Sequence, residues 1–387
     1  MIYMNSDKIK SIGIITHRGN YNYGGLLQAL ALQRWLTSQN FNVEIINLNK
    51  MQLTGSKIGR ITRALLTPID TFKKLIKSAN SRQNKQPLKS FMQIFFDFKD
   101  SAKMKYSTEV LPNTIGEITK KYDAIIVGSD QVWCYKYARP LIFFIQWKPI
   151  YKGLMLSYAA CSPDMDTPWY NRGIIKRQLM RFNEVSVRDT YTMKWVESIC
   201  NRKPLVVADP TLLYDFEDVI GPNEINEPYI FAYCLGSEIN GGHETVIKEI
   251  RKKYGAIKVI GVAIPNLSQE VEKFADEIIY DASPGKWLTL IKYATFVYTD
   301  SFHGCMFSLK FKKQFIAYYA QQSRASRLID IRNRYGLENA IVSSVSEMQE
   351  KQCIQNGIDY EKTNSLIQEH IDLSKQFLNN SLCSTNE

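Results

Sequence analysis

The stretch ATFVYTDSFHGCMFSLKFKKQFIAYY, residues 294–319, shows how this chain folds. Residues 294–298 are mostly apolar or aromatic, as expected of a buried strand, and residues 314–319 have a similar composition. The residues between them predict a helix that runs from His303. A strand, a helix and another strand in this order indicate a mostly parallel sheet with helices on both faces. The stretch therefore predicts an α/β fold.

The same alternation extends along the chain in two series. In the first series the sequence predicts strands at 9–16, 43–48, 122–127, 155–160, 185–188 and 205–208, and helices at 24–38, 168–182 and 191–199. After a polar stretch at 216–228, the second series has predicted strands at 229–235, 257–262, 295–298 and 314–319, and helices at 242–254, 284–293, from 303, and at 323–335. Two such series predict two Rossmann-like domains that face each other across a cleft.

The division into domains follows from these two series. We expect residues 1–217 to form an N-terminal Rossmann-like domain with a basic helical insert at about 50–105. Residues 218–345 form the expected C-terminal Rossmann-like domain, and residues 346–387 a helical tail with one long helix at 359–378. Ligands of such sheets bind at the carboxyl ends of the strands, so the site is expected between the domains.

The composition is that of an ordinary globular protein. The chain has 387 residues, of which 45% are hydrophobic and 22% charged, enough for two domains. No apolar run approaches the roughly 20 residues of a membrane-spanning helix, and the first residues show no secretory-signal pattern. Seven cysteines occur without CxxC pairs. We therefore expect a cytoplasmic setting and no metal site.

The net charge of +11 is concentrated in one segment. Residues 50–105 contain 13 Lys or Arg against 3 Asp or Glu, an excess of +10 that leaves the rest of the chain near neutrality. Apolar residues recur there at helical spacing with basic residues between them, and Pro68 divides the segment into two predicted helices. Such a segment suits either an anionic membrane at the inner face or a core-facing helix with a solvated basic face. No nucleic-acid motif accompanies the charge, so we expect no nucleic-acid partner.

Residues 299–305 place a histidine in the first turn of a predicted helix, directly after a buried strand. The unpaired N–H groups and the dipole of a helix N-terminus favour anions. An imidazole beside them can transfer a proton near neutral pH. His303 is thus either a proton donor at an anion site or a histidine hydrogen-bonded inside the fold.

Other polar clusters also follow predicted strands. Residues 17–25 join His17 to a glycine-rich helix start, and residues 127–133 combine Asp130, Gln131 and Trp133. The first suits an anion or sugar hydroxyls, and the second suits a carbohydrate site with an aromatic platform. An ordinary turn, a helix-capping Asp and a core Trp are the structural alternatives.

Two arginines lie at comparable positions. Arg188 ends a predicted strand and precedes a helix, and Arg327 lies at the head of a late helix. A guanidinium binds carboxylate or phosphate as a fork, but an internal ion pair or an exposed arginine would explain either residue equally. Asp209, in the turn 208–213, is expected to brace neighbouring loops.

Taken in order, these segments resemble the polysaccharide pyruvyl transferase family. The matching motifs are NYGGLLQALALQ at 22–33, VGSDQVW at 127–133, SVRD at 186–189, ADPTLL at 208–213, SFHG at 301–304, and the pairs Ser326-Arg327 and Gly336-Leu337. The match spans about residues 11–340. The resemblance implies a two-domain fold similar to GT-B. It also implies transfer of a pyruvyl group from phosphoenolpyruvate to a sugar of a surface or capsular polysaccharide precursor, which forms a pyruvate ketal.

The resemblance also implies roles for single residues. Arg188 matches an Arg of the family's donor site, and His303 matches the His of its Arg-x-His element. Ser301 stands where that element has Arg, so Arg327, Arg324 or Arg18 is expected to supply the missing charge. The expected catalytic residues are His303 and Asp130; the donor-binding residues are Arg188, Ser301, Phe302, Gly304 and Arg327; the acceptor-binding residues are His17, Asn22, Tyr23, Gly24, Gln131 and Trp133.

Phosphoenolpyruvate would serve as co-substrate, and no cofactor is expected. A lipid-linked or oligosaccharide acceptor is the expected partner, and the basic segment 50–105 is a candidate for peripheral contact with an anionic membrane. Two alternatives stay open at this point. One is a GT-B glycosyltransferase that uses a nucleotide sugar, and the other is a non-catalytic sugar-binding subunit of a polysaccharide assembly complex.

Overall fold

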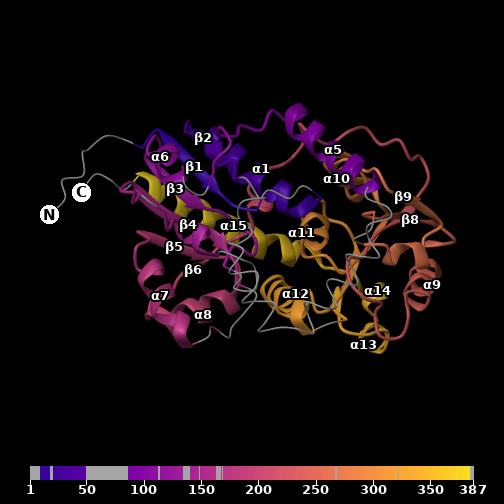
Figure 1. Cartoon of the computed structure of the whole chain (residues 1–387). Helices are drawn as coiled ribbons and strands as arrows, with labels where there is room; N and C mark the ends of the chain where they lie inside the picture. The colour runs from indigo at the N-terminus through magenta and orange to yellow at the C-terminus, as the bar shows by residue number, and fades with distance from the viewer. Residues whose placement is uncertain are drawn as a thin grey trace, which may run out of the picture.

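A computed structural model describes residues 9–17, 21–48, 86–111, 114–133, 140–147, 149–162, 167, 169–265, 268–320 and 322–383. The described chain contains two six-stranded sheets, each with parallel pairing throughout (Figure 1). The first has the order β2-β1-β3-β4-β5-β6. Its strands are β1 (Ser11–Ile15), β2 (Asn42–Ile45), β3 (Ala124–Val127), β4 (Leu154–Ala160), β5 (Glu184–Val187) and β6 (Leu205–Val206). We call the part of the chain that carries this sheet the N-terminal half.

The second sheet belongs to what we call the C-terminal half. Its order is β12-β11-β10-β7-β8-β9. The strands are β7 (Tyr229–Tyr233), β8 (Lys258–Val262), β9 (Glu277–Ile279), β10 (Phe296–Thr299), β11 (Phe315–Tyr318) and β12 (Ile341–Val342). The α/β prediction is confirmed. The short edge strands β9 and β12 were not expected, because two or three residues carry too little periodicity to indicate a strand.

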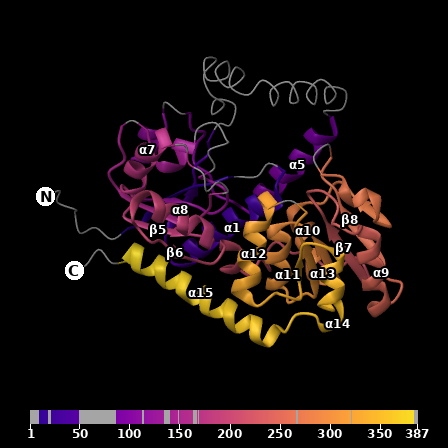
Figure 2. The same cartoon turned by 90° about the horizontal axis from the view of Figure 1, so that it is seen from below.

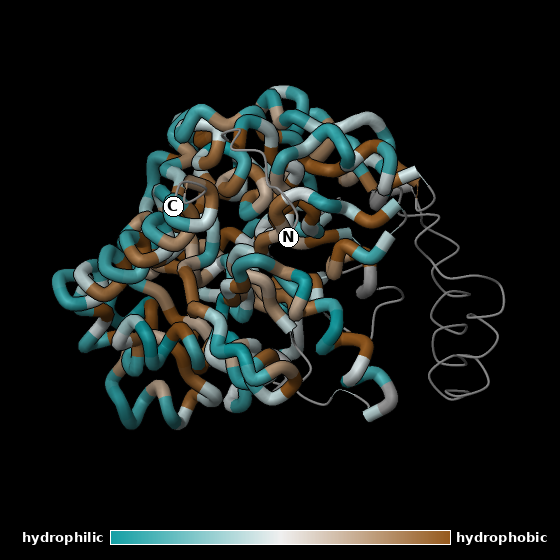
Figure 3. Tube along the Cα trace, turned by 90° about the vertical axis from the view of Figure 1, so that its left-hand side faces the viewer, coloured by the Kyte–Doolittle hydropathy of each residue, from teal (hydrophilic) through white to brown (hydrophobic). Residues whose placement is uncertain are grey.

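Helices connect the strands and cover the sheets. The longer ones are α1 (Tyr23–Ser38), α5 (Gln86–Ser101), α7 (Trp169–Leu179), α8 (Thr190–Cys200), α9 (His243–Tyr254), α10 (Pro284–Tyr293), α11 (Phe302–Lys310), α12 (Gln322–Tyr335) and α15 (Tyr360–Cys383). Shorter ones are α6 (Ile115–Thr119), η2 (Pro140–Phe144), η3 (Pro210–Leu212), η4 (Glu270–Lys273), α13 (Val345–Glu350) and α14 (Cys353–Asn356). Along the chain, hydrophobic stretches gather inside and hydrophilic ones outside (Figure 3).

The basic segment lies partly outside the described residues, which leave out 49–85. Its described end, helix α5, packs against α10 (Figures 1 and 2). Phe91, Phe95 and Phe98 of this helix are buried in the cluster that contains Tyr23 and Trp287. This end of the segment is therefore a core-facing helix. No helix in the described ranges is long and apolar enough to cross a membrane.

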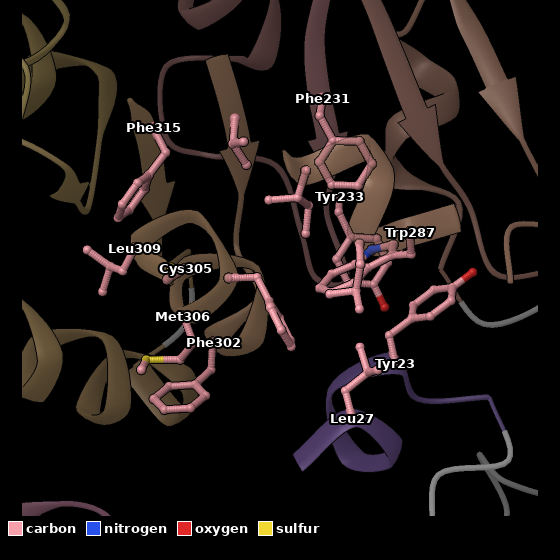
Figure 4. Packing of buried hydrophobic residues seen from close by; sticks show 14 of the residues in the cluster. Tyr23, Leu27, Phe231, Tyr233, Trp287, Phe302, Cys305, Met306, Leu309 and Phe315 are labelled. Atoms are coloured by element: carbon pink, nitrogen blue, oxygen red, sulfur yellow. The ribbon is translucent and has the colours of Figure 1, made fainter. Parts of the chain in front are cut away.

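The two halves share one hydrophobic cluster (Figure 4). Tyr23 of α1 stacks on Trp287 of α10, with ring centroids 5.2 Å apart and planes 6° apart. Its hydroxyl donates a hydrogen bond of 2.7 Å to the carbonyl of Ala282. Burial of aromatic rings at this scale favours association of the halves. The start of α1 is thereby fixed against the C-terminal half.

Helix α15 runs from the C-terminal half back to the N-terminal half (Figure 2). Near its start, the hydroxyl of Tyr360 donates to the carbonyl of Ser308 at 3.3 Å. Further along, Oγ of Ser374 accepts from the backbone N–H of Ala208 at 2.8 Å. Leu378 and Leu382 pack into the core of the first sheet. The predicted long C-terminal helix is confirmed, and it ties the two halves together.

Candidate active site

Arg188 directly follows β5 and is only 4% exposed. Its Nη1 donates to Oδ2 of Asp209 at 3.0 Å and to Oγ of Ser129 at 3.3 Å. Its Nη2 lies 3.7 Å from Oδ1 of Asp130. Among the described residues, neither Nε nor Nη2 has a hydrogen-bond partner. Buried donors are seldom left unpaired, so this edge of the guanidinium has the properties of an anion-binding group.

His303 lies in the first turn of α11 and is 7% exposed. Ser301 caps this helix by accepting from the N–H of Gly304 at 3.2 Å. The Nε2 atom of His303 lies 3.6 Å from Oδ2 of Asp209 and has no hydrogen-bond partner among the described residues. The structure thus brings Arg188, which follows β5 of the first sheet, and His303 of α11, in the C-terminal half, to the same carboxylate oxygen.

The N-terminus of α1 meets that of α11 at this point. Asn22 caps α1 by accepting from the N–H of Gly25 at 3.1 Å. A Cβ built on Gly24 would lie 2.0 Å from Nδ1 of His303, so only glycine lets the imidazole approach the helix so closely. A Cβ on Gly304 would meet Oγ1 of Thr299 at 2.6 Å, which explains the second glycine. Two helix N-termini that lie this close together favour a negatively charged ligand beside them.

Phe302 brings the two arginines to one ring. The Cζ of Arg188 lies 4.2 Å from the ring centroid and the Cζ of Arg327 lies 5.9 Å from it. Arg327 belongs to α12, whereas Ser301 caps α11. The charge of Arg327 therefore reaches the site from a different helix than the one that Ser301 precedes. Arg18 and the side chain of Arg324 lie outside the described residues.

Asp209 carries more than the bracing role expected from the sequence. Its Oδ1 accepts from the N–H and the hydroxyl of Thr211 at 3.0 and 2.8 Å, which is the expected brace. Its Oδ2 faces Arg188 and His303. Burial alone would raise the pKa of Asp209, but contact with His303 and Arg188 holds that pKa well below its ordinary value. Sequence reasoning missed this role, although the position of Asp209 just after a strand was a usable signal.

Asp130 lies beside the same cluster, with a left-handed φ of 77°. Burial alone would raise its pKa, but the charges of Arg188 and His17 outweigh burial and keep the pKa below its ordinary value. A Cβ on Gly25 would be 3.5 Å from Oδ2 of Asp130, so the carboxylate also lies near the start of α1. Asp130 is therefore an ionised hydrogen-bond acceptor at the site.

The expected acceptor residues fall into two groups. Gln131 directly follows Asp130, and its carbonyl lies 3.2 Å from Nε2 of His17, whose charge acts on Asp130. Asn22 and Gly24 lie at the start of α1, so these four residues are near the site. Tyr23 and Trp133 are core residues instead.

Trp133 is 0% exposed, stacks on Phe144 with centroids 5.6 Å apart, and has no face open to a sugar. In the sequence, the apolar residues before Trp133 could not distinguish an indole buried in the core from one exposed to a sugar. In the described part of the chain, no group of three His, Cys, Asp or Glu residues is placed to hold a metal ion.

Known proteins share this architecture. The UDP-N-acetylglucosamine 2-epimerase from Rickettsia bellii superposes with a TM-score of 0.53 at 12% identity, over 98% of this chain and 97% of that one. The UDP-GlcNAc 2-epimerase from Neisseria meningitidis, bound to UDP-GlcNAc, gives 0.53 at 10% identity over 97% and 100%. Such low identities show the fold alone, which is of the two-domain GT-B type, as expected. None of the curated proteins matches this chain significantly.

Sequence comparison with protein families gives a narrower result. The family model described as polysaccharide pyruvyl transferase matches residues 22–321. The matched region contains Arg188, Asp209 and His303, and it covers most of the chain. The chain therefore belongs to the polysaccharide pyruvyl transferase family.

Proposed function

We propose that the chain transfers a pyruvyl group from phosphoenolpyruvate to a sugar of a surface or capsular polysaccharide precursor and forms a pyruvate ketal. The single observation that carries this proposal is the convergence of Arg188 and His303 on Asp209. Among the described residues, Nε and Nη2 of Arg188 and Nε2 of His303 have no hydrogen-bond partner. Family membership supports the reaction class.

The donor fits the charges at the site. Phosphoenolpyruvate carries a carboxylate and a phosphate, and Nε and Nη2 of Arg188 form one edge that binds either group as a fork. Arg327 and the N-termini of α1 and α11 add positive potential for the second anionic group. The site thus offers positive groups for both anionic ends of a small ester.

The reaction requires a proton donor and an acceptor for hydroxyl protons. In our proposal, His303 protonates the methylene carbon of the enol, which becomes a methyl group and leaves an oxocarbenium-like centre at the neighbouring carbon. A sugar hydroxyl attacks this carbon, phosphate leaves, and a second hydroxyl of the same sugar closes the ketal. The two hydroxyls each release one proton, one restoring His303 and the other leaving with phosphate.

Two carboxylates assist these steps. Asp209 faces Nε2 of His303 and supplies a countercharge when the imidazole is protonated. Asp130, ionised and beside Arg188, accepts a hydrogen bond from the attacking hydroxyl. In this proposal, Trp133 and Tyr23 contribute packing only.

Phosphoenolpyruvate fits this chain better than a nucleotide sugar does. In the C-terminal half, the first N–H of α9 is already bound by Oε1 of Glu238 at 3.0 Å. Oε1 of Glu270 lies 3.3 Å from the ring of His243, and Oδ1 of Asp300 accepts from Leu235 at 2.6 Å. Carboxylates at this edge of the second sheet repel a diphosphate. The observation favours a donor held by Arg188 instead.

Incubation with carbon-labelled phosphoenolpyruvate and lipid-linked galactose, mannose and N-acetylmannosamine acceptors tests the proposal. We expect label in one glycan product, released as pyruvate by mild acid, together with one equivalent of phosphate. Thermal stabilisation by a uridine sugar nucleotide, with no label transferred from phosphoenolpyruvate, would contradict it.

A further inference from the structure

Asp330 of α12 reaches across the interface to the first turn of α8. The buried Oδ1 of Asp330 accepts from the backbone N–H of Thr190 at 2.9 Å and from its hydroxyl at 2.6 Å. Thr190 is the first residue of α8 and lies two residues after Arg188. Helices α8 and α12 lie side by side in both views (Figures 1 and 2). A carboxylate of the C-terminal half therefore caps a helix that starts at the donor site.

This cap is additional to the one that α8 supplies for itself. Asp189 already accepts from the N–H of Thr192 at 2.7 Å, as an ordinary N-cap does. The N–H of Thr190 is one of the other unpaired donors of the helix, and Asp330 satisfies it from outside. The second oxygen of Asp330 accepts from Nη2 of Arg334 at 2.6 Å, one turn later on α12. The carboxylate is thus held in place on its own helix while it bonds the other half.

Arg327 lies on the same helix as this contact. Arg327 precedes Asp330 by three residues on α12, a spacing that places the two on neighbouring positions of one helix face. Both Arg188 and Arg327 lie near the ring of Phe302, with Cζ atoms 4.2 and 5.9 Å from its centroid, so their like charges repel each other. The bond between Asp330 and Thr190 opposes that repulsion, because it joins the element of one arginine to that of the other.

We propose that Asp330 is a positioning residue for donor binding: by capping α8 across the interface, it holds Arg327 beside Arg188. The identity of the ligand rests on the proposed function, whereas the contact itself does not. The expected consequence is a loss of donor affinity when the cap is removed, without loss of the fold.

Titration calorimetry with phosphoenolpyruvate tests this inference on the full chain. Asp330→Ala is expected to raise the Kd about tenfold, and Asp330→Asn about threefold or less, because an amide oxygen still accepts both hydrogens of Thr190. Thr190→Val should weaken binding less than Asp330→Ala. The double variant should raise the Kd little more than Asp330→Ala alone does, since both changes remove the same interaction.

Asp359→Ala is the matched control. Oδ1 of Asp359 accepts from the N–H groups of Glu361 and Lys362 at 3.0 and 3.3 Å, so it also caps a helix, but not at the donor site. The Kd of Asp359→Ala for phosphoenolpyruvate should equal that of the wild type. Equal weakening by Asp359→Ala, or an unchanged Kd in Asp330→Ala, would overturn the inference.

Small-angle X-ray scattering separates this inference from the proposed function. If the wild type does not bind phosphoenolpyruvate, the proposed donor is wrong, yet the ligand-free protein still reports on the contact. We then expect a larger radius of gyration for Asp330→Ala than for the wild type and Asp359→Ala. Identical scattering of all three proteins would show that the contact from Asp330 does not hold α12, and with it Arg327, against α8.

Discussion

The imidazole of His303 lies against the backbone of Gly24, where a Cβ would be only 2.0 Å from Nδ1. No side chain fits between them. The contact brings the N-terminus of α1, in the N-terminal half, onto the N-terminus of α11, in the C-terminal half. It therefore fixes both the proton donor and the local potential at the place where an anionic donor is proposed to bind.

Gly24→Ala is predicted to displace His303 and to reduce pyruvyl transfer at least 100-fold, the order expected for loss of a general acid. The methyl group needs space that the ring now fills, so the imidazole must rotate away. Steady-state rates measure the effect, and circular dichroism checks the fold. Gly173→Ala is the control, because a Cβ there meets nothing within 4 Å. Wild-type rates in Gly24→Ala would show that the contact is not needed for transfer.

His303→Ala and His303→Gln are predicted to fold and to lose transfer by ~10²–10⁴-fold. Neither side chain donates a proton to carbon near neutral pH. His243→Gln provides the comparison. Its ring bonds Tyr298 at 2.7 Å in a buried network outside the proposed site, so the change should affect stability rather than the rate of transfer. Equal losses in the His243 and His303 variants would remove the special role of His303.

Stability is predicted to fall on acidification because of His370. Burial, together with the nearby charge of Arg334, lowers the pKa of His370 to about 4. In the unfolded chain this ring has a pKa near 6.5. The contribution of the neutral His370 to the free energy of unfolding is therefore fully present above that pH and is lost progressively toward pH 4. Urea unfolding at pH 7.5 and pH 5 should differ by about 2 kcal/mol from this residue alone. The difference should shrink in His370→Gln; an unchanged difference would assign the effect to other groups.

Trp133 is predicted to stabilise the fold without binding the acceptor. Trp133→Ala should lower the free energy of unfolding by ~3–5 kcal/mol, as expected for truncating a buried Trp. Trp133→Phe should keep the acceptor KM of the wild type. An acceptor KM raised tenfold in a fully folded Trp133→Phe protein would restore the sugar-platform interpretation.

Local patterns in the sequence were sufficient to predict the fold class and most of the strands. Buried parallel strands such as β3 and β10 consist mostly of consecutive apolar or aromatic residues, and α11, the helix after β10, begins at a Ser-capped turn. These local signals place the strands and therefore the carboxyl ends where polar residues gather. The short strand β12 and the packing of α5 depend on contacts between distant segments, which no local pattern records.

The site was only partly predictable for the same reason. Arg188 and His303 could be chosen because each follows a strand. The sharing of Asp209, the approach of Arg188 to Phe302 and the cap from Asp330 all cross the interface between the halves. Such relationships depend on how two sheets are oriented, and residue spacing within one chain segment does not encode that orientation. The complete burial of Trp133, which assigns it to the core, also depends on packing that the sequence pattern does not record.

Calorimetric titration of phosphoenolpyruvate into the wild type and Arg188→Lys tests the central claim most directly. The fork of Nε and Nη2 cannot be reproduced by an ammonium, so Arg188→Lys should raise the Kd at least tenfold. Arg202→Lys is the control, since Arg202 bonds the carbonyls of Phe182 and Asn183 on the outside of the same half. Saturable binding that weakens only in Arg188→Lys is the predicted result. A Kd that is the same in all three folded proteins would contradict the account.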